Sequence, residues 1–111
     1  MDYQWGIFWA DLEPVRGSEQ AGTRPVLVIS AEEANQALPV VTVIALTSMK
    51  PGRTVYSIET LLPAGTTGLP RDSIAMTHQV RSIAKEPLRE QCGAIDAETV
   101  RENIRRMYLD F

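Results

Sequence analysis

Residues 17–30 read GSEQAGTRPVLVIS, a small polar loop that passes through an arginine into an apolar run. Gly17 and Gly22 favour a loop, and the apolar, largely β-branched residues 26–29 favour a buried strand. Arg24 therefore stands where a loop meets the edge of a sheet. Its guanidinium is planar and permanently charged, so the position suits a group that grips a phosphate.

The rest of the chain predicts short strands on either side of this run. The predicted strands are Gly6–Leu12, Arg24–Ser30, Val40–Ser48, Thr54–Leu62, Ser73–Ile83 (bent, or two short strands) and Gln91–Ile95. Three helical segments are predicted: Ala31–Leu38 with Ser30 as N-cap, a brief turn at Lys85–Arg89, and a closing helix capped by Asp96. Together they predict an α+β fold, a small open antiparallel β-barrel with a C-terminal helix.

The two apolar strands of this sheet make a specific register testable. If Arg24–Ser30 and Val40–Ser48 are antiparallel neighbours, the pairing that sets Ile29 opposite Thr42 also sets Arg24 opposite Thr47. The polar residues that begin and end these runs then meet at one end of the sheet.

Size and composition predict one domain, residues 1–111, with a core of its own. The hydrophobic content of 44% and charged content of 23% are ordinary for a soluble protein. The one cysteine, Cys92, excludes an intramolecular disulfide and favours a reducing compartment. We see no signal-peptide pattern and no run of roughly 20 apolar residues, so we expect a cytoplasmic protein.

The charge distribution qualifies what the net charge indicates. A formal net charge of −3 argues against nucleic-acid binding in general. Residues 45–91, however, carry six Lys or Arg against four acids, whereas residues 1–44 carry two against six. A locally basic groove on an acidic protein is compatible with this pattern.

Arg24, Thr47 and Ser48 form the first candidate site. Cleavage of RNA by its own 2′-hydroxyl requires positioning, proton transfer, and cations or hydrogen-bond donors around the crowded phosphorus. Arginine supplies a charged fork and threonine a hydroxyl, which match two of these needs. The alternative is structural: Arg24 is a salt-bridge residue at the loop edge and Thr47 a cap at the strand end.

His78-Gln79-Val80-Arg81 forms the second candidate site. His78 is the one histidine and is expected to titrate near neutrality, although a single histidine is more often a surface or satisfied residue than a catalyst. Glu19 and Gln20 are candidates to bind bases or ribose, or are ordinary solvated loop residues. Aromatic residues that could stack on bases, but are more often core, are Trp5, Phe8, Trp9 and Tyr56.

We expect no metal and no cofactor. One histidine and one cysteine cannot make a zinc site, and no cluster of carboxylates has the spacing of metal ligands. The glycine-rich segment 65–68 lacks the lysine of a phosphate-binding P-loop.

Over nearly its whole length the sequence resembles the MazF/PemK toxins, ribosome-independent endoribonucleases that cut messenger RNA. The resemblance lies in IFWADLEP at 7–14, the 17–30 segment, ALTS at 45–48, residues 68–73, QVRSI at 79–83, and the helix from Asp96. It implies an SH3-like barrel of the CcdB/MazF/Kid type. It also implies a homodimer with a groove for single-stranded RNA, and sequence-specific cleavage to 2′,3′-cyclic phosphate and 5′-hydroxyl ends. The implied partner is an antitoxin whose disordered, largely acidic segment blocks the groove.

The resemblance also implies roles for individual residues. Arg24 and Thr47 correspond to the catalytic pair of the family, and the groove-lining residues are expected to be Ser18, Glu19, Gln20, Ser48, Gln79 and Arg81. The position before Gln79 is usually acidic in these toxins and has been assigned a proton-transfer role in some of them. Here it is His78, and we hypothesise that the imidazole takes over that role.

Two alternatives remain open at this point. CcdB-type toxins share the barrel but poison DNA gyrase and catalyse nothing, so fold does not decide the matter. Their lethal contact is made by C-terminal residues that typically include a tryptophan, whereas this chain ends MYLDF at 107–111. The second alternative is a member of the fold that binds RNA or a partner without cutting.

Overall fold

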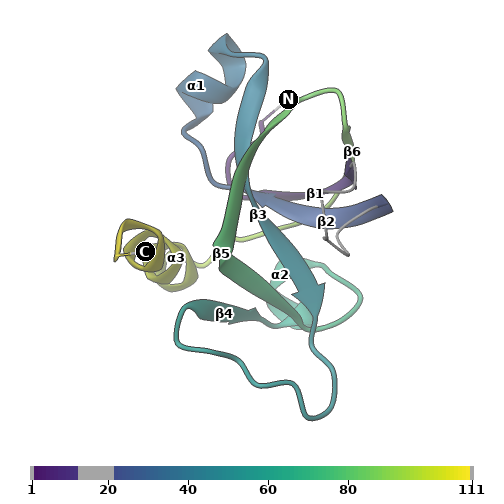
Figure 1. Cartoon of the computed structure of the whole chain (residues 1–111), viewed down its shortest axis with the longest axis vertical. Helices are drawn as coiled ribbons and strands as arrows, with labels where there is room; N and C mark the ends of the chain where they lie inside the picture. Colours follow the sequence, from purple (N-terminus) through teal and green to yellow (C-terminus); the bar gives the residue numbers. More distant parts are fainter. Residues whose placement is uncertain (1, 13–21, 111) are drawn as a thin grey trace.

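The computed structural model describes residues 2–12 and 22–110, apart from the side chain of Asp110. A six-stranded antiparallel sheet has the order β4-β5-β3-β2-β1-β6, so that β4 and β6 are its edges (Figure 1). Its strands are β1 (Gly6–Leu12), β2 (Gly22–Val28), β3 (Val40–Ser48), β4 (Glu59–Leu62), β5 (Ser73–Ala84) and β6 (Leu88–Ala94). The helices of the described part are α1 (Glu32–Ala37), α2 (Ala64–Thr67) and α3 (Glu98–Asp110).

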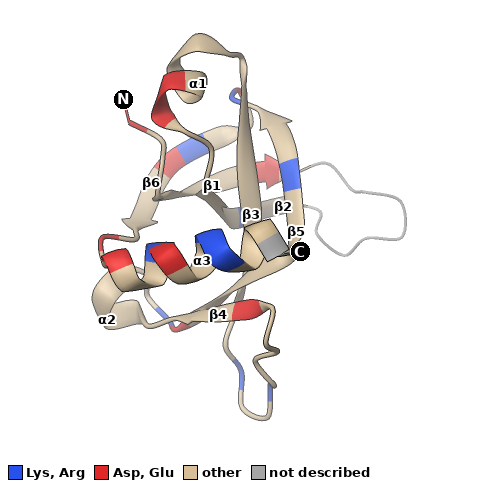
Figure 2. Ribbon diagram, turned by 90° about the vertical axis from the view of Figure 1, so that its left-hand side faces the viewer, with Lys and Arg blue, Asp and Glu red and all other residues tan. Residues whose placement is uncertain are grey.

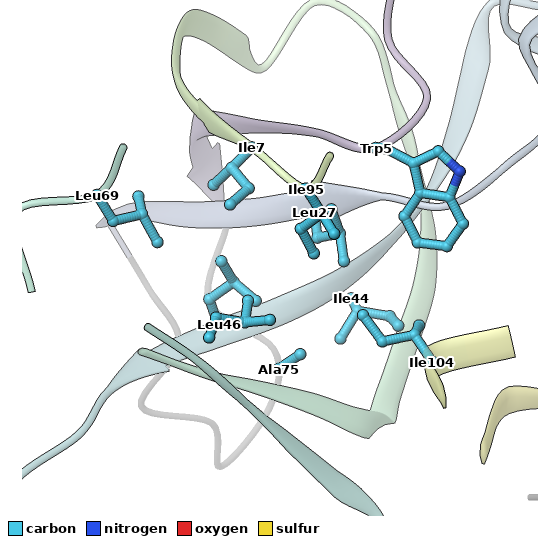
Figure 3. Close-up of a cluster of buried hydrophobic side chains, with 10 residues drawn as sticks. Trp5, Ile7, Leu27, Ile44, Leu46, Leu69, Ala75, Ile95 and Ile104 are labelled. Carbon is cyan, nitrogen blue, oxygen red and sulfur yellow. The ribbon is translucent and has the colours of Figure 1, made fainter. Parts of the chain in front are cut away.

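The sheet buries apolar side chains on both faces, because successive residues of each strand point to opposite sides. On the face covered by α3, which we call the helix face, the main cluster includes Leu27, Ile44, Leu46 and Ile104 (Figure 3). The opposite face buries a second cluster, composed of Phe8, Ala10, Leu12, Val26, Val28, Val41, Val43 and Ile83. Both faces of the central strands β2 and β3 are therefore core, as their near-continuous apolar runs predict.

Trp5 joins the N-terminal segment to α3. Its ring is buried in the helix-face cluster, and the guanidinium carbons of Arg101 and Arg105 lie 5.6 and 5.2 Å from its centroid. Its backbone has a φ of 65°, unusual for a residue with a side chain. This strained conformation is held by hydrogen bonds from its N–H to Val28 and from Ile95 to its carbonyl, at 2.8 and 2.9 Å.

The predicted α+β fold with a C-terminal helix is confirmed, and its sheet is open rather than closed into a barrel. β1 and β3 have the predicted limits, and β5 is the predicted bent strand. In the described part of the chain, no helix is long and apolar enough to cross a membrane.

Two predicted helical features are wrong. Ser30 is not the N-cap of α1. Ala31 occupies that position, while the Ser30 hydroxyl donates to Asn35 and accepts the Thr42 N–H at 3.0 Å. Lys85–Arg89 is not helical, because the Leu88 N–H closes a tight turn on the Lys85 carbonyl at 2.9 Å and β6 begins there.

The ends of several other elements also differ from prediction. β2 spans Gly22–Val28 where Arg24–Ser30 was predicted, and β6 spans Leu88–Ala94 where Gln91–Ile95 was predicted. Of the predicted strand Thr54–Leu62, only β4 is paired. β4 pairs with Ser73–Met76 of β5, and β5 bends immediately afterwards, so residues 54–58 have no neighbouring strand to pair with. Asp96 lies one residue outside the cap of α3, whose first hydrogen bonds are accepted by the Ala97 carbonyl.

Candidate active site at the ends of strands β2 and β3

The predicted register of β2 and β3 is confirmed. Val26 pairs with Ala45 and Val28 with Val43, and the Ile29 N–H donates to the Thr42 carbonyl at 3.0 Å. Continued by two residues, this register brings Arg24 level with Thr47 at the end of the two strands. Arg24 is therefore two residues beyond Val26, and Thr47 two beyond Ala45, on the face opposite the helix face.

The neighbouring strands frame this pair with apolar residues. Arg24 pairs with Ala10 of β1, and Thr47 pairs with Ile74 of β5. Both side chains are half-buried, while Ala10 and Ile74 are fully buried. The Arg24 guanidinium and the Thr47 hydroxyl thus lie at the margin of the apolar core, and both residues belong to strands rather than to loops. Such a setting preorganises hydrogen-bond donors around an anion.

An ion pair ties the next row of the sheet together. Asp11 pairs with Thr23 across β1 and β2, accepts the Thr23 hydroxyl at 2.9 Å, and forms a salt bridge with Arg89 of β6. The hydrogen bond from Arg89, then that from Thr23, lowers the pKa of Asp11 below its ordinary value, so it stays ionised near neutral pH. This arrangement fixes the strand ends immediately beside Arg24.

Ser48 points away from the predicted pair. It follows Thr47 directly and so projects to the helix face, where it lines a cavity of about 200 Å³. The other lining residues are Trp9, Pro25, Leu69, Pro70, Arg71 and Ser73. The structure therefore separates Thr47 and Ser48 between the two faces, although both stand at the same end of β3.

His78 and Gln79 lie on a bend in β5. The β3–β5 ladder passes from Ile44–Val80 to Leu46–Ala75, so residues 76–79 of β5 face Ala45 alone. This irregularity bends the strand, leaving His78 exposed and Gln79 half-buried. Alternation along a regular strand does not predict where these two side chains point.

Arg81 shares the face of Arg24 but not its row. It pairs with Val43, four residues along β3 from Thr47, which is about 13 Å at the rise of a strand. It lines a cavity of about 500 Å³ together with Asp11, Leu12, Ser82, Ile83, Ala84, Glu86 and Pro87. Its charge is placed for a longer ligand that extends along the face. The remaining predicted site residues, Ser18, Glu19 and Gln20, lie outside the described residues.

Sequence reasoning missed a buried carboxylate near this site. The Glu59 side chain is 1% exposed and accepts hydrogen bonds from both Arg53 nitrogens Nη1 and Nη2, at 3.1 and 2.9 Å, and from the Tyr56 N–H at 3.0 Å. Burial raises its pKa, but Arg53, the Tyr56 N–H and the charge of His78 bring it below the ordinary value. Alternation gave no signal for it, because it places Glu59 with Ser57 and Leu61 and opposite the buried Leu62.

Metal-ligating residues do not gather among the described residues: no group of three or more His, Cys, Asp or Glu is placed to hold an ion. Cys92 is half-buried, and burial raises the pKa of its thiol.

Comparison with known proteins identifies a family whose sequence model matches most of this chain. A family model described as PemK-like, MazF-like toxin of type II toxin–antitoxin system matches residues 3–107. The endoribonuclease MazF9 of Mycobacterium tuberculosis (strain ATCC 25618 / H37Rv) is 41% identical over 96 residues, covering 82% of this chain and 80% of that protein.

Solved structures share the fold over most of their length. The crystal structure of MazF (Form-I) from Deinococcus radiodurans superposes with a TM-score of 0.77 at 26% identity, covering 96% of this chain and 92% of that one. An endoribonuclease in complex with its cognate antitoxin, from a mycobacterial species, has a TM-score of 0.77 over 99% of this chain and 93% of that one. At 14% identity, that likeness shows the fold alone.

Proposed function

Because this chain belongs to the PemK-like, MazF-like toxins of type II toxin–antitoxin systems, we propose that it is an endoribonuclease that cuts single-stranded messenger RNA. The similar protein MazF9 is named an endoribonuclease. The observation that carries the proposal for this chain is the register of β2 and β3, observed from Val26–Ala45 to Val28–Val43, which sets Arg24 level with Thr47 when it is continued by two residues.

The proposed reaction is an internal transesterification. The 2′-oxygen of one nucleotide attacks the adjacent phosphorus and the bond from phosphorus to the 5′-oxygen breaks. The attacking hydroxyl loses a proton and the departing oxygen gains one. The products are a 2′,3′-cyclic phosphate and a 5′-hydroxyl, and the step itself consumes neither water nor a metal ion.

Arg24 and Thr47 supply what this step requires at the phosphate. The Arg24 guanidinium stabilises the negative charge that builds on the non-bridging oxygens, and the Thr47 hydroxyl donates a hydrogen bond to the same group. The strands that hold both backbones keep them in place before substrate arrives. This is why a half-buried position at a strand end serves better than a surface loop.

His78 is our candidate for proton transfer. It is exposed on the bend of β5, and its charge reaches the buried Glu59. Replacing His78 with alanine tests the role directly, because loss of a general acid or base changes the pH dependence of kcat/KM. An unchanged pH–rate profile in His78→Ala would remove it from the mechanism.

The groove extends from this centre. Arg81 lies about 13 Å along the same face and supplies a further positive charge for the RNA backbone. We assign Gln79, on the bend between Arg81 and the catalytic pair, to contacts with bases or ribose. Ser48 is assigned to RNA contacts from the other side of the strand end, and Ser18, Glu19 and Gln20 to contacts from the segment before β2.

The proposed partners follow from the family. We assign the chain a cognate antitoxin, since its family is defined by toxin–antitoxin systems and a protein of this fold is solved in complex with its antitoxin. We also assign it a homodimer in the cytoplasm. Exposed apolar side chains on β4 and α3, namely Leu61, Tyr108 and Leu109, supply surface that a second copy would bury.

The decisive experiment uses the purified protein, a long single-stranded RNA, excess EDTA and low salt. We expect cuts at a repeated short sequence, with loss of cleavage on the order of 10²-fold or more in Arg24→Ala and no change in its unfolding temperature. Near-full activity of Arg24→Ala would refute the assignment, and absence of cuts by folded wild-type protein would refute the nuclease.

The gyrase-poison alternative is not favoured. The matched family and the similar protein MazF9 both indicate a ribonuclease toxin. If the RNA assay fails, gyrase inhibition and RNA binding without cleavage are the next measurements.

A further inference from the structure

The loop between β3 and β4, residues 49–58, forms a wall beside the proposed catalytic pair. Its residues Met49 and Val55 pack on a buried cluster of Ala45, Ile74 and Met76. Ala45 precedes Thr47 by two residues on β3, and Ile74 pairs with Thr47, so the cluster lies on the face that carries Arg24 and Thr47. Met49 and Val55 therefore anchor the loop to that face near its two ends, and the rest of the loop projects beyond the ends of β3 and β4 (Figures 1 and 2).

A buried ion pair fixes the conformation of this loop. Figure 2 shows basic residues on the loop and an acidic residue at the start of β4. That acid, Glu59, is held by both terminal nitrogens of Arg53, whose side chain is 27% exposed, and by the Tyr56 N–H. The Glu59 N–H also donates to the Tyr56 carbonyl at 2.9 Å. A buried ion pair adds little net stability for its desolvation cost, so its clearest consequence here is the geometry it imposes.

That geometry presents an aromatic ring to solvent. Tyr56 is 59% exposed, which among the large hydrophobic residues of the described chain is exceeded by Leu109, and the Arg53 guanidinium lies 5.6 Å from its ring centroid. The charge of the Arg53 guanidinium is already compensated by Glu59. We therefore expect the guanidinium to support the Tyr56 ring by contact rather than to bind a phosphate of the RNA. An exposed ring with fixed orientation is the feature that single-strand binding proteins use to stack unpaired bases.

We propose that Tyr56 is a stacking platform for an unpaired nucleobase of the bound RNA, with Arg53 supporting the ring and Glu59 acting as the positioning residue. The inference rests on the proposed function in taking single-stranded RNA as the ligand of this face. Stacking does not distinguish strongly among bases, so the platform contributes affinity and placement of the strand. Because the Arg53–Glu59 pair carries no net charge, we expect the contribution of the Tyr56 platform to RNA affinity to be insensitive to salt concentration.

The test uses an oligonucleotide containing the cleavage sequence, with a 2′-deoxy nucleotide at the reacting position so that it binds without being cut. 2-Aminopurine replaces one base at a time, and its fluorescence is quenched where it stacks on an aromatic ring. We expect quenching at one position in the wild type and Tyr56→Phe, and its loss in Tyr56→Leu. The Kd of Tyr56→Leu should rise on the order of tenfold, equally at low and high salt.

Steady-state kinetics, together with the unfolding temperature, distinguish a loss of RNA positioning from a loss of folding. Tyr56→Leu should raise KM while leaving kcat and the unfolding temperature close to wild type, and Tyr56→Phe should restore KM. Glu59→Gln should also raise KM, but it leaves the Arg53 charge without its buried partner and should therefore lower the unfolding temperature as well. The matched control is Leu38→Ala, because Leu38 is also an exposed apolar residue but follows α1, at the other end of the molecule (Figure 1). It should change neither KM nor Kd.

The outcomes distinguish this inference from the proposed function. Cleavage by wild type, with the same Kd and the same fluorescence in Tyr56→Leu at every base, overturns the platform and leaves the nuclease standing. Binding that depends on Tyr56 without any cleavage supports the platform and refutes the nuclease. Unchanged RNA binding with weakened self-association in Tyr56→Leu would show that the ring contacts a second protein chain instead.

Discussion

At the scale of single residues, Arg24 and Thr47 derive their proposed roles from position more than from chemical type. Surface arginines and strand-end threonines are common, and most have structural roles. Here a register confirmed at Val26–Ala45 brings the two to the same row and face of the sheet when it is continued by two residues. Fixed donors act on an anion without reorganising, and this makes such a pair effective in a transition state.

Two substitutions of Thr47 distinguish the role of its hydroxyl from the role of its side-chain shape in packing. Thr47→Val keeps the β-branched form but removes the donor, and we expect kcat to fall by about 10²-fold with little change in KM. Thr47→Ser retains the hydroxyl and should retain most of kcat. Single-turnover cleavage of a short RNA measures both, and equal loss in the two variants would mean that packing, not the hydroxyl, accounts for the effect.

Glu32 carries a pH dependence of stability. Burial raises its pKa, but hydrogen bonds from Gln36, the Gln4 and Tyr3 N–H groups and Asn35 bring it down to about 2, from 4.5 when unperturbed. A depressed folded pKa means that the stabilisation is complete above about pH 4.5 and is lost as pH falls toward 2. We expect the unfolding temperature to drop across this range in the wild type.

Glu32→Gln tests the origin of that drop. The variant should be less stable than wild type at pH 7, and the difference should shrink as pH falls below 4.5. A residual slope is expected, because Asp11, Glu59 and Glu98 also have lowered pKa values. Thermal unfolding followed by circular dichroism gives both curves, and parallel curves for the two proteins would contradict the assignment.

At the scale of elements, the bend of β5 organises the site. Four of its residues, 76–79, face one residue of β3, so the strand turns where His78 and Gln79 lie. The bend also ends the pairing with β4 and so releases residues 54–58 as a loop. One irregularity in a ladder thus creates both the exposed histidine and the loop that carries Tyr56.

A second contact between elements constrains Gly93 of β6. A Cβ at this position would lie 2.6 Å from the Thr67 carbonyl oxygen of α2, a backbone atom that cannot move aside cheaply. We expect Gly93→Ala to destabilise the fold by about 1–3 kcal/mol. Gly65→Ala is the matched control within α2, since nothing lies within 4 Å of its added Cβ. Urea unfolding measures both, and equal midpoints for the two variants would refute the clash.

At the scale of the whole molecule, the charge is acidic overall, and the proposed groove sets Arg24 and Arg81 beside two acids, Asp11 and Glu86. The net charge is −3, yet Arg24 and Arg81 share one face, and Arg53 is neutralised by Glu59. Electrostatic attraction of RNA should therefore be modest and local. Specific contacts, rather than a broad basic surface, must supply most of the affinity.

The salt dependence of RNA binding measures how much of the affinity comes from electrostatic contacts with phosphates. With two arginines at phosphates, the slope of log K against log salt concentration should be about −1.4 per groove for a single strand. Arg81→Gln should reduce its magnitude by about 0.7. Fluorescence anisotropy with the uncleavable oligonucleotide gives the slope, and a much steeper value, or one that Arg81→Gln leaves unchanged, would place the phosphate contacts elsewhere.

The sequence by itself determined the α+β class, the limits of β1 and β3, and the register of β2 with β3. These follow from local rules, since side chains alternate along a strand and a single pairing fixes all the others. Only the tertiary structure decided three features. These are the bend of β5, the unpaired first half of the predicted strand Thr54–Leu62, and the buried salt bridge between Glu59 and Arg53. Each of these depends on whether a neighbouring strand or charge is present in space, and periodicity along the chain holds no information about that.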